Sequence, residues 1–278
     1  MRETFNLAQN IKDHGRETDR GTNQNFGNDA NEPNRHAGMG LYPSDLAQRK
    51  LVLDELGHIG GLTGGLSDER RGDTTYGTKT LQRRESERLI EAAKKCGLYV
   101  PPKDCARIYG ERVQQASGES VVYYNEGAKV YTKIKDPYAK AAIKNTWPED
   151  AIYEHVIHNM LFPGTAYRLV GVTEDIDGVR LILEQNAVVA AKERATSKQA
   201  QEYLEKELSL TKDTDDLYMY GNEDLAVTDI NAENSDNVLL GDDNRLHFID
   251  PLIRLKRPAK EIIEKYIGEG IGHPLLDR

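Results

Sequence analysis

The chain has 278 residues, which is long enough for one large or two small domains with a buried core. Its formal net charge is −9, whereas binding to nucleic acid requires a surplus of Lys and Arg on one face. This composition argues against a nucleic-acid-binding protein and favours an acidic enzyme or binding module.

Neither a signal peptide nor a membrane span is expected, because the N-terminus is polar and no apolar run reaches ~18 residues. The two cysteines, Cys96 and Cys105, lack the spacing of metal ligands. We therefore expect a reduced, cytoplasmic protein.

The first hundred residues predict a polar N-terminal extension with two helices. Residues 1–42 contain few aliphatic side chains, so burial cannot offset the entropy of ordering them. Helical spacing of apolar residues predicts helices at 44–57, ending at Gly57, and at 81–97, ending at Gly97. The glycines at 60, 61, 64 and 65 lack the flanking strand and Lys of a phosphate-binding loop, which indicates a linker.

Pro101 and Pro102 mark the predicted boundary of a second domain, residues 101–278, with an α+β pattern. Strands are expected at 121–124, 130–134, 167–172 and 179–183, with a helix at 148–161 between the second and third. Thr146 and Glu149 have the spacing of a capping box for that helix. Further helices are expected at 197–209 and 258–267.

The stretch from Thr228 to Pro251 carries the residues with the clearest chemical role. Val238–Leu240 and Leu246–Ile249 form two short apolar strands around a polar turn, which predicts a β-hairpin. Asn234 or Asn237 precedes the hairpin, Asp250 follows it, and Asp229 lies on the approaching loop. Oxygen ligands that converge in this way favour magnesium.

This layout resembles the catalytic loop and metal-binding segment of protein kinases. Asp229 and Asn234 are separated by four residues, as in that family, and Asp250 takes the place of the magnesium-binding Asp. Val-Thr replaces His-Arg before Asp229, and Pro-Leu replaces Phe-Gly after Asp250. Asn237 also leads directly into a strand, so the choice between Asn234 and Asn237 stays open.

With the phrases Ser-Gly-Glu-Ser-Val-Val-Tyr, His-Asn-Met-Leu-Phe-Pro and Leu-Glu-Gln, residues 105–256 are most similar to the kinase domains of polyvalent proteins from phages and conjugative elements. The resemblance implies a kinase-like two-lobed α+β core. Its small lobe, about 105–190, would carry an antiparallel sheet, and its reduced helical lobe would span about 191–278. The implied activity is phosphorylation of a protein on Ser, Thr or Tyr with ATP and Mg²⁺.

The resemblance also implies roles for single residues. Asp229 would be the catalytic base, and Lys133, with Lys135 as its rival, would position the ATP phosphates. Glu154, with Glu149 as its rival, would pair with that Lys.

Gly118 would lie in the glycine-rich loop, and the backbone at Glu184 would contact the adenine. Asp250 and Asn234 or Asn237 would bind magnesium.

Two other functions remain open. A small-molecule kinase would share the Asp-Asn-Asp core, and the roughly 28 residues after Asp250 are few for peptide recognition. A non-catalytic pseudokinase, acting as a protein-interaction module, is favoured by the single glycine of the glycine-rich loop and by the missing His-Arg.

Overall fold

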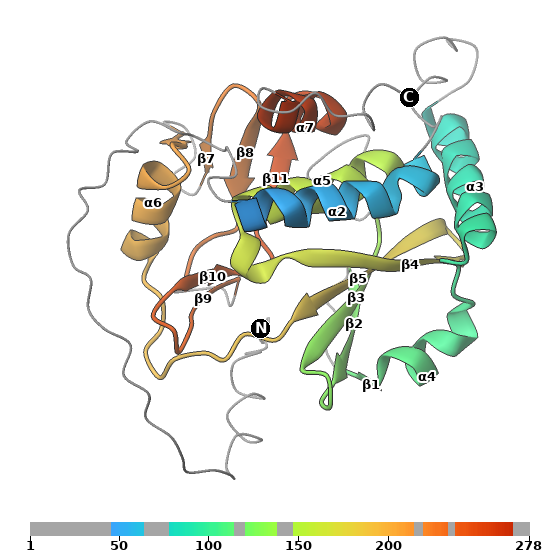
Figure 1. Ribbon diagram of the computed structural model, residues 1–278, viewed down its shortest axis with the longest axis horizontal. Coiled ribbons are helices and arrows are strands. Elements are labelled where there is room, and N and C mark those ends of the chain that lie inside the picture. The colour runs from blue at the N-terminus through green and yellow to red at the C-terminus, as the bar shows by residue number, and fades with distance from the viewer. Residues whose placement is uncertain are drawn as a thin grey trace.

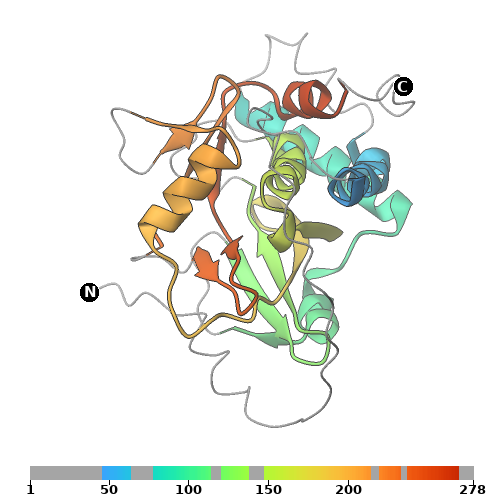
Figure 2. The same ribbon diagram turned by 60° about the vertical axis from the view of Figure 1, so that its left-hand side comes forward.

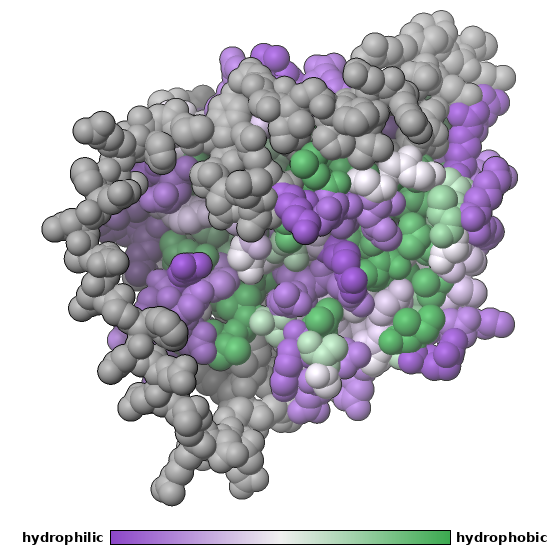
Figure 3. Space-filling view, in the orientation of Figure 1, coloured by the Kyte–Doolittle hydropathy of each residue, from purple (hydrophilic) through white to green (hydrophobic). Residues whose placement is uncertain are grey.

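The computed structural model describes residues 46–63, 78–113, 120–137, 147–213, 219–232 and 237–268. The polar segment 1–42 lies outside these ranges. Figure 1 shows a sheet crossed by long helices, followed by a C-terminal part with shorter strands and helices. Hydrophilic and hydrophobic residues are interspersed on the face that Figure 3 shows. Within the described ranges, no helix has both the length and the apolar character needed to cross a membrane.

The N-terminal sheet has five antiparallel strands in the order β1-β2-β3-β5-β4, and all four strands expected from the sequence are confirmed within it. The helix expected between the second and third of these is α5, Pro148–Leu161. The strands are β1 (Glu111–Arg112), β2 (Ser120–Asn125), β3 (Val130–Lys135), β4 (Tyr167–Asp175) and β5 (Gly178–Asn186).

The register of β3 and β5 decides which side chains share a face. Lys133 lies opposite Leu183, and Thr132 lies opposite Glu184. Because directly opposed residues of an antiparallel pair point to the same side, Lys133 and Leu183 share one face. Helix α4 (Cys105–Tyr109) packs on the other face, against Tyr123 and Ile182.

Helix α5 is the centre of the core, since almost all of its residues are buried. It contacts α2, α3, β4 and the C-terminal helix α7 (Ala259–Gly268). Several polar residues of α5 are buried as well, which requires specific partners. The predicted capping box is wrong: the N-cap is Trp147, which supplies no side-chain capping bond, and the Glu149 amide donates to Glu85 of α3 at 2.9 Å.

Strand β4 is one of the two edge strands of the sheet, and side chains form hydrogen bonds with the backbone groups that point outward from it. Asn159 bonds both the amide and the carbonyl of Tyr167, each at 2.7 Å. Glu55 accepts from the amide of Leu169, and His58 bonds the Leu169 carbonyl, each at 2.8 Å. Unpaired edge groups would otherwise template pairing with another chain.

A bulge between Leu169 and Gly171 shifts the register of β4. Beyond it, the segment Leu98–Val100 bonds both backbone groups of Val172, at 2.8 and 2.9 Å. The described part of the β4 edge is therefore covered by α5, by α2 and by the segment that follows α3.

Helices α2 (Leu46–Thr63) and α3 (Thr78–Cys96) belong to the same core as α5. Helix α2 runs beside α5 in both Figures 1 and 2, and α3 contacts both of these helices. Their buried residues include Val52, Ile59, Leu62, Leu89, Ile90 and Ala93. The boundary proposed near residue 101 therefore does not coincide with an edge of the hydrophobic core.

Gly57 does not end the first helix, contrary to the sequence prediction, because α2 continues to Thr63. A glycine inside a helix costs about 1 kcal/mol, whereas burying a Leu or Ile side chain contributes about 1.5–3 kcal/mol. Ile59 and Leu62 lie beyond Gly57 and are fully buried, so their burial extends the helix. Gly60 and Gly61 are helical too, while Gly64 and Gly65 lie outside the described residues. Gly97 does end α3, with a positive φ of 73°.

The C-terminal part contains α6 (Ser197–Lys206), α7 and two small sheets. The predicted hairpin is confirmed as β9 (Val238–Leu240) and β10 (Leu246–Phe248). Strands β6 (Thr211–Lys212), β7 (Tyr220–Gly221), β8 (Leu225–Thr228) and β11 (Leu252–Leu255) form a sheet that was not predicted.

Asp224, at the start of β8, is fully buried and fastens α7 to the strand that leads to Asp229. Its carboxylate accepts from Lys265 at 2.7 Å, pairs with Arg257 at 3.2 Å and accepts from the Tyr266 hydroxyl. Burial opposes ionisation, but these donors outweigh it and lower the pKa of Asp224. Its stabilisation is therefore present above the ordinary Asp pKa and is lost as the pH falls through the lowered value.

Replacing Asp224 by Asn is expected to destabilise the protein by about 2 kcal/mol, because the fully buried position loses the charged acceptor of the bonds from Lys265 and the Tyr266 hydroxyl. Urea unfolding at neutral pH measures this. The control is Glu223→Gln, since Glu223 is exposed and also contacts Lys265, at 2.6 Å. An exposed pair contributes about 1 kcal/mol or less, so equal effects of the two substitutions would contradict the anchoring role.

Candidate active site

Strand pairing brings Asp229 and Asp250 to the same place. Strands β8 and β11 are antiparallel, and Thr228 lies opposite Leu252. Asp229 follows β8 directly, and Asp250 precedes β11 by two residues. The two carboxylates are close enough that the charge of Asp250 contributes to the pKa of Asp229.

The β9–β10 hairpin adds Asn237 to this pair. The Ile249 amide donates to the Asn237 carbonyl at 2.7 Å, so Asn237 lies beside the residue that precedes Asp250. The Asn237 side-chain amide donates to Oδ2 of Asp229 at 2.7 Å and to its carbonyl at 3.1 Å. Asp229 has a φ of 59°, in a region that Asp tolerates better than most residues, and these two bonds hold it there.

Lys133 of β3 completes the group from the N-terminal sheet. Its side chain is about 10% exposed, and Nζ lies 3.4 Å from Oδ1 of Asp250. Nζ also donates to the Tyr167 hydroxyl at 2.7 Å. Because an unpaired buried ammonium is costly, these partners, together with the Ile249 carbonyl at 3.4 Å, account for its burial.

The charges at the site influence one another in opposite directions. Burial lowers the pKa of Lys133, and Asp250 partly offsets this. The Asp250 side chain is about half exposed, and although the surrounding protein disfavours its ionisation, Lys133 and then Lys135 act more strongly together and lower its pKa. Burial and the charge of Asp250 raise the pKa of Asp229, although its bond from Asn237 acts the other way.

Tyr167, the first residue of β4, is a site residue that the sequence analysis missed. Its hydroxyl accepts from Lys133, donates to the Ile249 carbonyl at 2.5 Å and lies 3.4 Å from Oδ1 of Asp250. The ring of His158 packs on it, with centroids 4.6 Å apart. In sequence a Tyr at the start of a strand indicates only a packed aromatic residue, so no signal distinguished it.

Gln185 is a second missed residue, although it belongs to the Leu-Glu-Gln phrase. It is buried near the end of β5, and its amide donates to the carbonyls of Thr165 and Ile249, at 2.7 and 3.2 Å. Thr165 in turn donates to the Phe248 carbonyl at 2.6 Å. The segment before Asp250 is therefore fixed by the N-terminal sheet and by the loop after α5.

The other predicted residues lie at various distances from this group. Glu154 is buried on α5. The pKa of Tyr167 is raised mainly by its own burial and by Asp250, and more weakly by the charge of Glu154. Glu149 is buried at the first turn of α5, next to α3. The Glu184 side chain binds Arg168 at 2.6 Å. Lys135 is half-buried, and it acts on Asp250 through its charge. Gly118 and Asn234 lie outside the described residues.

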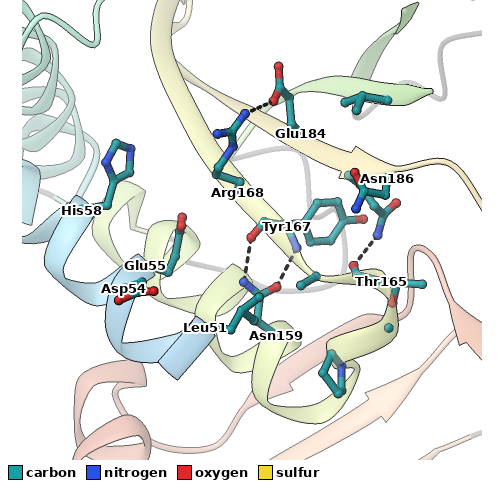
Figure 4. A pocket seen from close by; sticks show the side chains of 15 residues that line it. Leu51, Asp54, Glu55, His58, Asn159, Thr165, Tyr167, Arg168, Glu184 and Asn186 are labelled. Atoms are coloured by element: carbon teal, nitrogen blue, oxygen red, sulfur yellow. Dashed lines mark hydrogen bonds and ion pairs between the residues drawn. The ribbon is translucent and has the colours of Figure 1, made fainter. Parts of the chain in front are cut away.

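A pocket of about 520 Å³ lies beside Tyr167, between α2, the loop after α5 and the ends of β4 and β5. Figure 4 shows its wall, with Asp54 and His58 of α2 on one side and Arg168 and Glu184 on the other. Tyr167 and Gln185 line it, but Lys133, Asp229 and Asp250 do not. The pocket is thus separate from the cluster of Lys133, Asp229 and Asp250.

The oxygen atoms at this site suit a magnesium ion that is also bound by the phosphates of a nucleotide. Magnesium is usually bound by one or two carboxylates together with substrate phosphates. Asp250 and Asn237 present oxygen donors of this kind next to the Lys133 ammonium. In the described ranges, three or more His, Cys, Asp or Glu side chains do not gather around one point, so an all-protein metal cage is not present there.

The family model described as "Serine/Threonine/Tyrosine Kinase found in polyvalent proteins" matches residues 82–257, more than half of the chain. The match begins within α3, so it includes every candidate site residue but not α2. Neither a curated protein nor a solved structure matches the chain. The chain therefore belongs to the serine/threonine/tyrosine kinase family found in polyvalent proteins.

Proposed function

We propose that the protein transfers the terminal phosphoryl group of ATP to a protein hydroxyl, with magnesium bound at Asp250 and Asn237. The observation that supports this most is the contact of the buried Lys133 ammonium with Asp250, beside the Asp229–Asn237 pair. Family membership supports the same reaction class. In such reactions catalysis depends mainly on positioning and on neutralising charge.

Asp229 is the proposed catalytic base. Asn237 holds Oδ2 of this carboxylate, so we assign the acceptance of the substrate proton to Oδ1. A raised pKa brings the base nearer to neutral pH, where proton transfer to it is more favourable. The strained backbone at Asp229 further fixes the direction of its side chain.

Lys133 and Asp250 have complementary roles in the proposal. Lys133 would contact the nucleotide phosphates, and Tyr167 would keep its ammonium directed there. Asp250 and Asn237 would hold the magnesium ion, which neutralises phosphate charge when it is bound. The lowered pKa of Asp250 keeps this carboxylate ionised and available as a ligand.

A small-molecule hydroxyl is a second candidate acceptor, and one observation favours it. Strand β11 begins two residues after Asp250, and only Lys256, Arg257 and Pro258 separate it from α7. This part of the chain therefore offers little surface for an extended peptide. Assays with a peptide library and with a panel of small alcohols would distinguish the two classes of acceptor.

The nucleotide site can be tested by thermal unfolding with ATP and Mg²⁺, compared with ATP and EDTA. Ligand at 100 times its Kd contributes about 2.7 kcal/mol. For a chain of this size we expect Tm to rise by about 5 °C in the presence of magnesium. Asp250→Ala is expected to abolish the magnesium-dependent part of this rise.

Asp242→Ala is the matched control, because Asp242 is an exposed carboxylate in the β9–β10 turn. The Asp242→Ala variant should keep the full magnesium-dependent rise in Tm. A wild-type protein without any shift at millimolar ATP would instead support a non-catalytic interaction module.

The role of Asp229 predicts a specific pH dependence. The base works only when it is deprotonated, so kcat should fall at acid pH, with a midpoint above the ordinary pKa of Asp. Asp229→Asn should lower kcat by about 10²–10⁴-fold. Asn237→Ala removes a bond that lowers the pKa of Asp229, so the acid limb of kcat against pH should move to higher pH. An unchanged acid limb in Asn237→Ala would argue against Asp229 as the base.

A further inference from the structure

Helix α2 lies outside the residues that the family model matches, yet one of its side chains joins two elements of the candidate active site. Glu55 is buried, at 8% exposure. Its Oε1 lies 2.8 Å from Nε2 of His155 on α5 and accepts from the Leu169 amide on β4, also at 2.8 Å. α2 and α5 run side by side in both ribbon views (Figures 1 and 2).

Both partners of Glu55 are close in sequence to residues that hold Lys133. Leu169 is two residues after Tyr167 on the same strand, so the two share an edge of β4. His155 lies one turn before Asn159, which bonds both backbone groups of Tyr167. Glu55 thereby connects α5 to β4, and Asn159 makes a second connection between the same two elements one helical turn further along α5.

The carboxylate form of Glu55 is required for this connection. Burial opposes its ionisation, but the hydrogen bond and charge of His155, together with the Leu169 amide, outweigh burial and lower its pKa. The His155 side chain is 2% exposed, and its Nδ1 has no hydrogen-bond partner among the described residues. Both bonds are made to the same oxygen, Oε1, so replacing the charged carboxylate by a neutral amide weakens the bonds to a buried imidazole and to a buried backbone amide together, which favours displacement of α5 from β4.

His58 provides an internal comparison. It lies one turn after Glu55 on α2 and bonds the carbonyl of the same residue, Leu169, at 2.8 Å. His58 is exposed, and this bond reaches β4 but not α5. His58→Ala therefore removes a contact of α2 with β4 and leaves the contact of α2 with His155 on α5 in place.

We propose that Glu55 is a positioning residue that holds α5 and β4 in the arrangement in which Tyr167 contacts Lys133. Helix α2 is then an element of the active centre that this chain adds to the matched family region. The proposal rests on the proposed function, since it assigns Glu55 a role in placing the nucleotide-binding Lys.

The test uses the full-length chain with Glu55→Gln, His155→Gln, the double substitution and His58→Ala as the matched control. The first readout is hydrogen exchange of the α5 amides and of the strand β4 amides around Tyr167. Glu55→Gln should raise exchange in both elements, whereas His58→Ala should leave α5 unchanged. The double variant should resemble Glu55→Gln alone, because the two residues act through one contact.

The second readout is the binding and turnover of Mg·ATP. Displaced catalytic groups cost up to about 100-fold, so we expect Glu55→Gln to lower kcat/KM for ATP about tenfold or more. His58→Ala should change it less than about threefold by the same reasoning.

Equal effects of Glu55→Gln and His58→Ala in both readouts would overturn the positioning role and leave α2 as a cover for the sheet edge. If wild-type protein binds no nucleotide, the proposed function fails. The exchange readout then still decides whether Glu55 positions α5 and β4.

Discussion

The candidate site depends on one buried ammonium group. Lys133 is held between the Asp250 carboxylate and the Tyr167 hydroxyl, and each contact belongs to a different part of the fold. An ammonium in this place would be unfavourable without both partners. The N-terminal sheet and the segment that carries Asp250 are therefore joined by the same residues to which we assign nucleotide and magnesium binding. The Ile249 carbonyl, which accepts from Tyr167 and Gln185, strengthens this junction.

Much of the fold could be predicted from local pattern, because alternation and turn residues act over short distances. The strands around Lys133, helix α5 and the β9–β10 hairpin are of this kind. Contacts between distant residues could not be predicted. The cap of α5 comes from Glu85 on another helix, and β8 is recognisable as a strand only through its pairing with β7 and β11. Helix α2 continues beyond Gly57 because tertiary packing buries Ile59 and Leu62.

The candidate site likewise combines residues that a local pattern predicts with residues that only distant contacts reveal. Asp229, Asp250 and one of Asn234 and Asn237 follow from the hairpin and its flanking loops, and the structure brings Asp229, Asp250 and Asn237 together. Tyr167 and Glu55 lack any local signal, because a strand Tyr and a helix Glu are ordinary residues in sequence. Their importance comes from burial at the edge strand β4, where backbone groups need side-chain partners. Helix α2 looks like part of a polar extension in sequence and is part of the core in three dimensions.

The central claim is that Lys133 faces the phosphates of a bound nucleotide, and covalent labelling tests it most directly. An acyl phosphate derivative of ATP transfers its acyl group to an amine beside the phosphates, and the lowered pKa of Lys133 leaves more of that amine unprotonated, which is the form that reacts. Mass spectrometry of the labelled protein should find the acyl group on Lys133, and excess ATP with Mg²⁺ should prevent it. Labelling that bypasses Lys133, or that persists in excess ATP, would contradict the account.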